Sequence, residues 1–265
     1  MYSVPHLLLV AVFLLPARPA FLAFGLWALY MATMMTGLLR PRSTLFGANY
    51  WHAPPQPRVA LTFDDGPHPD DTPVILDILR QHGVRATFFM IGELARAHPE
   101  LVRQVVGAGH ETGVHSDTHP WWFSLAGPAR LRREIRRATS TLQDIVGRRQ
   151  RFFRPPMGHK NFFLPDELAA ADLQMATWSA RSYDTLGRAP ETIRDLILAR
   201  ATPGGIILLH EGVKREAGKP SPTIVALPAI IEGLRARHLE PVSLGDLRQA
   251  AEPGAVSRSQ ALPRS

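Results

Sequence analysis

The sequence predicts an α/β fold, a distorted (β/α)7-type barrel preceded by an N-terminal transmembrane segment or helical hairpin. From residue 58 onward, short apolar runs of strand length alternate with amphipathic helical segments, which is typical of a parallel sheet. Unusual polar residues stand at the ends of several of these strands. Upstream of them, residues 20–39 carry no charged side chain, and this length crosses about 30 Å of hydrocarbon.

The N-terminal region, residues 1–42, has three competing interpretations. It is a helical hairpin whose first arm is the apolar run 7–15, a single anchor at 20–39, or a cleaved signal peptide. The signal peptide is disfavoured because no Lys or Arg precedes the first apolar run. A buried helix of a soluble protein is the remaining alternative. We expect a membrane anchor of the bacterial inner-membrane type, followed by a proline-rich linker at 43–57.

The orientation in the membrane stays open. Arg40 and Arg42 follow the apolar segment, whereas only Arg18 interrupts it earlier. Positive charge favours the cytoplasmic side, but a difference of one charge decides little.

The composition restricts the chemistry of any site. The chain of 265 residues has no cysteine, which excludes disulfides, thiolate catalysis and cysteine-bound zinc. A metal would therefore be held by His, Asp or Glu. The net charge of +7 fits an anionic partner or an arginine-rich solvated surface. No nucleic acid is expected as a partner, and nothing in the sequence predicts the oligomeric state.

The barrel domain is expected at 58–250. Strands are predicted at 59–63, 86–91, 111–115, 152–154, 174–178, 206–209 and 240–242, and helices at about 72–81, 99–108, 128–146, 165–171, 191–201 and 223–237. No glycine-rich dinucleotide turn is present, which favours a closed or nearly closed barrel over a doubly wound sheet. Chemistry is then expected at the carboxyl ends of the strands. Residues 251–265, rich in Pro, Ser and Arg, are expected to be a disordered tail.

Two adjacent carboxylates, Asp64 and Asp65, end the first predicted strand. Neighbouring side chains on extended backbone point in different directions, so one carboxylate can bind a metal while the other transfers a proton. A solvated acidic turn is the alternative for this segment taken alone.

Two histidines, His115 and His119, follow the third predicted strand at a spacing of four. On a helical turn such residues share a face and can bind one metal. Eleven histidines in the chain make a chance pair common. Together with an upstream Asp, however, they form a facial set that leaves positions open for water and substrate.

Two further polar residues, Arg154 and His210, end the fourth and sixth predicted strands. An Arg held by two prolines can keep a carboxylate ionised, or can form a structural ion pair. A His at the end of an apolar strand can be an acid catalyst or a satisfied core residue.

Four motifs in order, TFDDGP at 62–67, HSDTH at 115–119, RPPMG at 154–158 and LLH at 208–210, resemble those of the polysaccharide deacetylases. This family is also called the NodB homology domain or carbohydrate esterase family 4, and the resemblance covers about 58–247. It implies a metal-dependent hydrolase that removes N-acetyl (acyl) groups from amino sugars of a polysaccharide or glycan precursor.

The resemblance also implies roles for individual residues. Asp65, His115 and His119 would bind a divalent metal, zinc with cobalt, nickel and manganese as alternatives. Asp64 would be the general base, His210 the general acid, and Arg154 would orient the base. The substrate pocket would be lined by Pro156, Met157, Trp178 and Leu208.

The chain departs from the family pattern at two positions. Met157 stands where the family often has an aromatic residue, and Arg181 stands where many members have an Asp that pairs with the catalytic His. A cation at 181 would lower the pKa of His210, and Asp184 is an alternative acidic partner.

Three functions therefore compete. The first is deacetylation of an N-acylated amino-sugar glycan, and the second is deacylation of a lipid-linked amino sugar, which the contact of the N-terminal segment with membrane lipid motivates. The third is a catalytically silent glycan-binding protein, supported by Arg181 alone.

Overall fold

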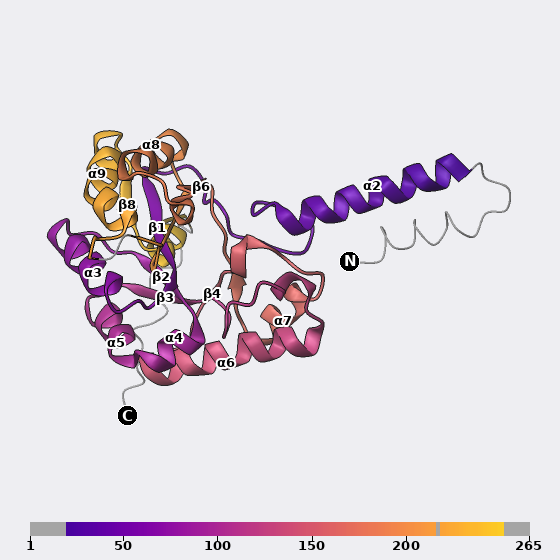
Figure 1. Cartoon of the computed structure of the whole chain (residues 1–265), viewed down its shortest axis with the longest axis horizontal. Helices are drawn as coiled ribbons and strands as arrows, with labels where there is room; N and C mark the ends of the chain where they lie inside the picture. Colours follow the sequence, from indigo (N-terminus) through magenta and orange to yellow (C-terminus); the bar gives the residue numbers. More distant parts are fainter. Residues whose placement is uncertain (1–19, 216–217, 252–265) are drawn as a thin grey trace, which may run out of the picture.

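The computed structural model describes residues 20–215 and 218–251, and its strands form one curled, open parallel sheet (Figure 1). The sheet has eight strands in the order β5-β4-β3-β2-β1-β7-β6, and β8 pairs with the start of β1. The strands are β1 (Arg58–Gly66), β2 (Thr87–Met90), β3 (Glu111–Val114), β4 (Phe152–Phe153), β5 (Gln174–Met175), β6 (Ala180–Arg181), β7 (Ile206–His210) and β8 (Glu240–Val242). The predicted α/β barrel-like fold is confirmed, with β6 as a strand that the sequence pattern did not reveal.

The curl of the sheet follows from the connection between its two edge strands. β5 and β6 lie at opposite edges, yet only residues 176–179 join them. An extended chain of this length spans no more than about 18 Å. The two edges therefore approach each other without pairing, which leaves a half-barrel rather than the closed barrel considered from the sequence.

Helices cover the outer face of the sheet. They are α3 (Asp71–Gln81), α4 (Gly92–Ala97), α5 (Pro99–Gly107), α6 (Pro128–Val146), α7 (Leu164–Ala170), α8 (Pro190–Arg200) and α9 (Pro222–Ala236). The last helix, α10 (Leu244–Ala251), instead packs Leu244 and Leu247 into the apolar cluster that contains Trp178. Short 3-10 turns lie at Phe123–Leu125, Pro156–Gly158 and Asp184–Leu186. The six helices predicted in the barrel domain are present within one residue at each end, whereas α4 and α10 were not predicted.

Side chains of the strands alternate between two apolar clusters. Val59, Leu61 and Phe63 of β1 belong to the large cluster that includes helix residues, whereas Ala60 belongs to a smaller cluster with Trp178 inside the curl. Alternation of this kind is the period of two of an extended strand. It determines which strand-end residues point into the half-barrel.

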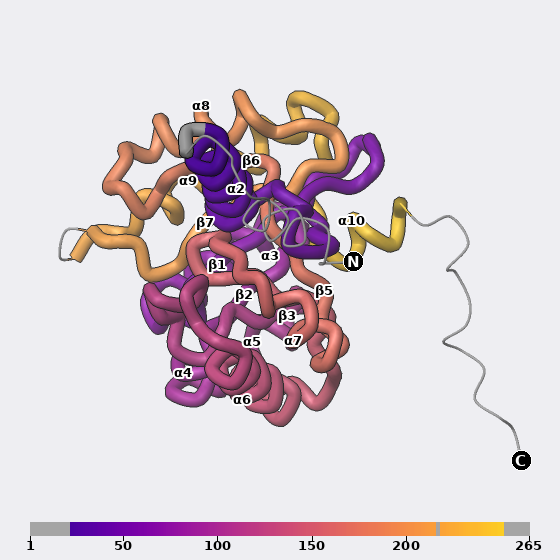
Figure 2. The backbone as a smooth tube through the Cα atoms, turned by 90° about the vertical axis from the view of Figure 1, so that its right-hand side faces the viewer, coloured from indigo at the N-terminus to yellow at the C-terminus, as the bar shows by residue number. Residues whose placement is uncertain are grey.

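The helix α2 (Ala20–Leu39) projects from the body of the molecule (Figures 1 and 2). Within the described residues it is the one helix long and apolar enough to cross a membrane, over Leu22–Leu39, and 6% of that window is buried. Phe24 and Leu29 are 67% and 64% exposed. This exposure contradicts the interpretation as a buried core helix. The apolar run 7–15 and the tail from residue 252 lie outside the described residues.

The end of α2 is attached to the rim of the half-barrel through Lys160. The backbone N–H of Lys160 donates to the Leu38 carbonyl at 3.1 Å, and its Nζ donates to the carbonyls of Arg40 and Pro41 at 2.6 and 2.7 Å. The ammonium thus lies just beyond the C-terminus of α2, where a cation stabilises the helix dipole. The chain that follows α2 then runs along the sheet, where Tyr50 forms a bridge with Ala176.

Candidate active site

Asp64 and His210 follow, at a spacing of two, the strand residues whose side chains point into the half-barrel. In β1, Asp64 is two residues beyond Thr62, and in β7, His210 is two residues beyond Leu208. β1 and β7 pair in parallel so that Asp64 lies opposite His210. The predicted base and acid therefore come from facing positions on neighbouring strands, and both are buried.

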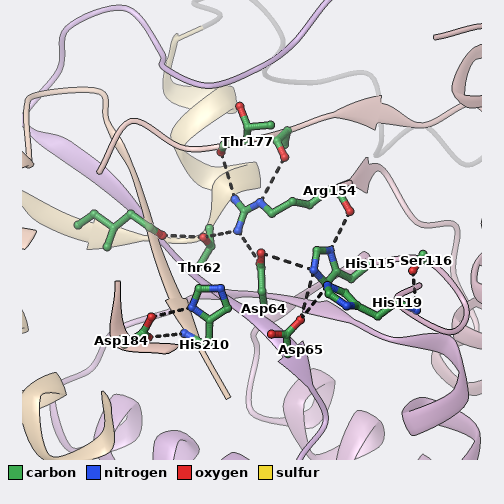
Figure 3. Close-up of polar contacts among 12 residues, drawn as sticks. Thr62, Asp64, Asp65, His115, Ser116, His119, Arg154, Thr177, Asp184 and His210 are labelled. Carbon is green, nitrogen blue, oxygen red and sulfur yellow. Dashed lines mark hydrogen bonds and ion pairs between the residues drawn. The ribbon is translucent and has the colours of Figure 1, made fainter. Parts of the chain in front are cut away.

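Three side chains meet at this end of the half-barrel in a set that can hold a metal (Figure 3). Asp65 Oδ1 lies 3.4 Å from His115 Nε2 and 3.5 Å from His119 Nε2. Their ligand atoms all lie within 4.8 Å of one another. The structure thus brings together the three residues predicted as metal ligands.

The chemistry of this set fits a divalent metal. Asp65 Oδ1 is buried without a hydrogen bond within the described residues, which is unusual for a carboxylate oxygen. His115 donates from Nδ1 to the Arg154 carbonyl at 2.8 Å, so its Nε2 keeps the lone pair that faces Asp65. A backbone carbonyl on the far nitrogen is the usual support of a metal-binding imidazole. Two neutral imidazoles and one carboxylate suit zinc and similar ions.

The loop between the two histidines is not a helical turn, and the geometric assumption behind the spacing of four was wrong. Ser116 and His119 have positive φ values of 64° and 47°, so the chain reverses sharply. Ser116 Oγ accepts from the His119 backbone N–H at 3.0 Å. Two further N–H groups of the loop, those of Asp117 and Thr118, donate to Glu134 of α6. The histidines converge because this loop is held on both sides.

Asp65 also departs from the extended backbone assumed from the sequence. Its φ is 70°, and the pairing of β1 with β2 shifts register between Asp64 and Gly66. This bulge turns Asp65 toward the histidines while Asp64 continues into the half-barrel. The two carboxylates therefore diverge, as predicted, but through a left-handed residue rather than through strand alternation.

Arg154 holds Asp64 from inside the half-barrel. Its Nη1 donates to Asp64 Oδ1 at 2.6 Å and to Thr62 Oγ1 at 2.8 Å, and the remaining nitrogens reach the carbonyls of Ala176 and Thr177. The guanidinium is completely buried and stacks 4.0 Å from the centre of the Phe89 ring. It occupies the open seam between β5 and β6. Because its backbone carbonyl also accepts from His115, one residue positions both the predicted base and a predicted metal ligand.

His210 pairs with Asp184, the alternative partner considered from the sequence. His210 Nδ1 donates to Asp184 Oδ1 at 2.7 Å, and its backbone N–H donates to Oδ2 at 2.8 Å. Thr223 Oγ1 donates to the same Oδ2 at 3.0 Å. The pKa of His210 is opposed by burial but raised overall by the charge and hydrogen bond of Asp184. A raised pKa keeps the ring protonated, as a general acid requires.

Arg181 does not act on His210 as the sequence suggested. Its guanidinium lies 4.8 Å from the Tyr183 ring centre and 5.8 Å from that of Trp178. Tyr183 has a positive φ of 57°, and this turn places Asp184, rather than Arg181, beside His210. The expected lowering of the His210 pKa by a cation is therefore wrong.

The ionisation of the metal set reflects its shared burial. Burial opposes ionisation of Asp65, but the close contact with His115 and the charges of His115, His210 and His119 hold its pKa well below the usual range. Burial would lower the pKa of His115, whereas the charges of Asp64 and Asp65 raise it overall. The pKa of His119 is lowered by burial and by the charge of His115. Metal binding therefore competes with a proton on His115.

The four residues predicted to line a substrate pocket lie in different surroundings. Met157, 41% exposed, and Trp178 line one cavity, and Met157 has a positive φ of 56°. Pro156 is buried in the same loop, and Leu208 lies in the inner apolar cluster and does not line this cavity.

Sequence reasoning missed one buried acid next to the site. Glu211 follows His210, and its Oε1 accepts from Thr72 Oγ1 at 2.8 Å. A Cβ at Gly66 would come within 1.4 Å of Glu211 Oε2, so a larger residue there would require the Glu211 carboxyl group to move. Burial, with the nearby charges of Asp71 and Asp65, raises the pKa of Glu211 to about 8. A Glu directly after the LLH motif was the available signal.

A half-barrel with a His/His/Asp set, a buried base and a paired His is the arrangement of a metal-dependent hydrolase. Comparison with known proteins gives the family. The model described as polysaccharide deacetylase matches residues 52–176. A chitooligosaccharide deacetylase of Sinorhizobium fredii is 36% identical over 188 residues, which are 68% of this chain and 87% of that protein.

Two further relatives point the same way. A peptidoglycan-N-acetylglucosamine deacetylase of Bacillus cereus is 34% identical over 73% of this chain and 69% of its own length. The solved structure of a peptidoglycan N-acetylglucosamine deacetylase with 4-naphthalen-1-yl-N-oxidanyl-benzamide superposes with a TM-score of 0.68 at 32% identity, covering 75% of this chain and 92% of the other. The chain belongs to the polysaccharide deacetylase family, carbohydrate esterase family 4. It is a hydrolase of non-peptide carbon–nitrogen bonds.

Proposed function

We propose that this protein deacetylates an N-acetylated amino sugar of the N-acetylglucosamine type in a glycan or glycan precursor. One observation carries the proposal: three groups lie together at one end of the sheet. They are the Asp64–Arg154 ion pair, the His210–Asp184 pair and the three-residue metal set. The names of the relatives support the amino-sugar substrate.

The proposed chemistry assigns one task to each side chain. A divalent metal held by Asp65, His115 and His119 would polarise the amide carbonyl and acidify water. Asp64, held by the Arg154 guanidinium at 2.6 Å, accepts the proton of the attacking water. Protonated His210 donates to the amine nitrogen as the carbon–nitrogen bond breaks, because an unprotonated amine leaves poorly. Zinc is our proposed metal, with cobalt, nickel and manganese as alternatives.

Release of acetate from N-acetylglucosamine oligomers by the purified full chain tests the proposal. The metal is stripped with a chelator, and zinc, cobalt, nickel or manganese is added back. We expect Asp64→Asn to lose at least 100-fold in turnover while it still binds metal. Asp166→Asn, which removes an exposed carboxylate of α7, is the matched control and should be unchanged. Full metal-dependent activity in Asp64→Asn would exclude the proposed base.

We further propose that α2 anchors the enzyme in a bacterial-type inner membrane. Support comes from its length, its lack of charge and the exposure of its apolar side chains. Membrane fractionation of the full chain and of a variant without residues 1–39 tests the anchor. The full chain should resist extraction by carbonate and require detergent, whereas the variant should be soluble. A soluble full chain would refute the anchor.

The alternative of a silent glycan-binding protein loses its support. It depended on Arg181 as the neighbour of His210, whereas Asp184 forms that contact at 2.7 Å. A binding site alone has no need of a base and a protonated acid.

A further inference from the structure

A cavity of about 750 Å³ lies where the end of α2 meets the rim of the half-barrel. Its lining contains four arginines, Arg40, Arg42, Arg181 and Arg200, together with His159, and no Asp or Glu. Thr36 and Leu39 of α2 form the wall on the side of the anchor. We call this cavity the junction cavity.

The cations of the junction cavity are not neutralised by protein carboxylates. None of its four arginines forms an ion pair within residues 20–215 and 218–251, whereas Arg132 and Arg235 elsewhere on the surface pair with Glu167 and Glu240 at 2.9 and 2.7 Å. The pKa of His159 is lowered by burial and then by the charges of Arg181 and Lys160. Positive charge is therefore concentrated in the cavity, where residues 20–215 and 218–251 supply no counter-charge.

Aromatic rings orient three of these cations, of which Arg42 lies 5.5 Å from the Trp51 ring centre. Arg181 lies over Trp178 and Tyr183, and Arg200 lies 5.9 Å from the Tyr183 ring centre. The Nε of Arg181 is buried and makes no hydrogen bond within the described part of the chain. A stacked guanidinium with an unused N–H is prepared for an anion, because its donors are fixed in direction before the ligand arrives.

The position of the cavity links it to the proposed chemistry. Two guanidinium groups lie close to the Trp178 ring. That of Arg154, which holds Asp64, is 5.7 Å from the ring centre, and that of Arg181 in the cavity is 5.8 Å from it. Met157 of the RPPMG loop also lines the cavity. The cavity thus lies between the catalytic loops and the segment that would enter the membrane.

We propose that the junction cavity binds the phosphate or diphosphate of a membrane-borne carrier lipid to which the N-acetylated amino sugar is attached. The inference rests on the proposed deacetylation and narrows its substrate class. Guanidinium groups bind phosphate oxygens in bidentate geometry, and the absence of carboxylates removes competition. An uncharged glycan would make no use of four clustered arginines, whereas phosphate at the membrane surface lies at the depth where α2 ends.

Kinetics with a matched pair of substrates test the assignment. The full chain in phosphatidylcholine nanodiscs is given N-acetylglucosamine joined to a farnesyl chain through a diphosphate, or through a neutral ether. We expect the diphosphate substrate to have a KM at least 10-fold lower. Arg181→Gln and Arg200→Gln should raise that KM about 10- to 100-fold with little change in kcat, and leave the ether substrate unaffected. Arg181→Lys should retain part of the preference.

Further measurements distinguish a specific phosphate site from an effect of net charge, from a loss of deacetylation and from binding of bulk lipid headgroups. Arg103→Gln removes an exposed arginine of α5 that forms no ion pair within the described residues, and it should change nothing, which excludes an effect of net charge. Direct binding of farnesyl diphosphate, followed by tryptophan fluorescence, needs no turnover, so it stands even where deacetylation fails. Equal KM values for both substrates, or no loss of binding in the arginine variants, would overturn the proposal. Abolition of the preference by tenfold excess phosphatidylglycerol would assign the cavity to bulk headgroups and overturn it as well.

Discussion

Replacement of Asp184 by Asn tests the proposed acid step most directly. Asp184 receives both hydrogen bonds that position His210, one from the ring Nδ1 at 2.7 Å and one from the backbone N–H at 2.8 Å. An Asn offers one oxygen and one NH2 group in the same place, so one of the two donors of His210 would face another donor. The charge that favours the protonated ring is lost at the same time.

The size of the effect follows from the distance. Opposite charges about 4 Å apart in surroundings of effective dielectric constant 20 attract by about 4 kcal/mol. An Asn dipole retains part of this, so we expect a loss of about 2–4 kcal/mol, or roughly 30- to 1,000-fold in kcat/KM for amides. The pKa of His210 falls, and because the protonated ring is the acid, the decline of activity at high pH moves to lower pH.

The assay compares an N-acetyl amide with an aryl acetate ester. A phenolate leaves without protonation, so Asp184→Asn should keep most of its esterase activity while it loses deacetylation. Thr223→Val, which removes one neighbour of Asp184 but leaves both bonds to His210, is the matched control. Equal losses on amide and ester, or an unmoved pH profile, would refute the reasoning and leave Asp184 a structural role.

Three further predictions address the metal set, the buried Arg154–Asp64 ion pair and the buried Glu211. Loss of a hydrogen bond that supports a metal ligand costs about 10–100-fold in metal affinity, so His119→Ala, which removes a proposed ligand itself, should cost more. Metal analysis after dialysis measures this, and an unchanged metal content would contradict the assignment of His119 as a ligand. Arg154→Met should lower the free energy of unfolding by about 3–5 kcal/mol because Asp64 remains buried without its partner. Urea denaturation measures this, and the added Asp64→Asn change should recover part of the loss; no recovery would argue against the pair. In the wild type, the raised pKa of Glu211, about 8 against 4.5 when unfolded, means that the folded state binds more protons and that stability falls as pH rises from about 4.5 to 8. Glu211→Gln should remove this dependence and melt at a higher temperature at pH 9; identical pH profiles would show that Glu211 does not titrate as described.

The sequence predicted that the polar residues of the site gather at the carboxyl ends of the strands. Asp64 and His210 each end an apolar strand, and the parallel pairing of β1 with β7 brings these two residues to facing positions. Arg154 could be assigned to a carboxylate because it ends a strand before two prolines, but its grip on the β5–β6 seam depends on tertiary structure. The helices were predicted well where one apolar face recurs over three turns, as in α6.

What the sequence could not predict depends on turns and on very short elements. The choice between Arg181 and Asp184 as the partner of His210 is made by β6, two residues long, and by the left-handed Tyr183. Neither has a periodic pattern. The convergence of His115 and His119 likewise depends on a loop held by Glu134, nineteen residues from the first histidine, which no local spacing reveals.

The attachment of α2 through Lys160 has a consequence for which sugars can reach the site. If residues 43–57 were a flexible linker, the distance between the catalytic domain and α2 would vary over about 20 Å. Three hydrogen bonds from the buried Lys160 instead fix the end of α2 against the rim of the half-barrel. With α2 as the proposed anchor, the height of the catalytic end above the bilayer would be fixed, so a sugar would be selected by how far from the membrane it is presented as well as by its chemistry.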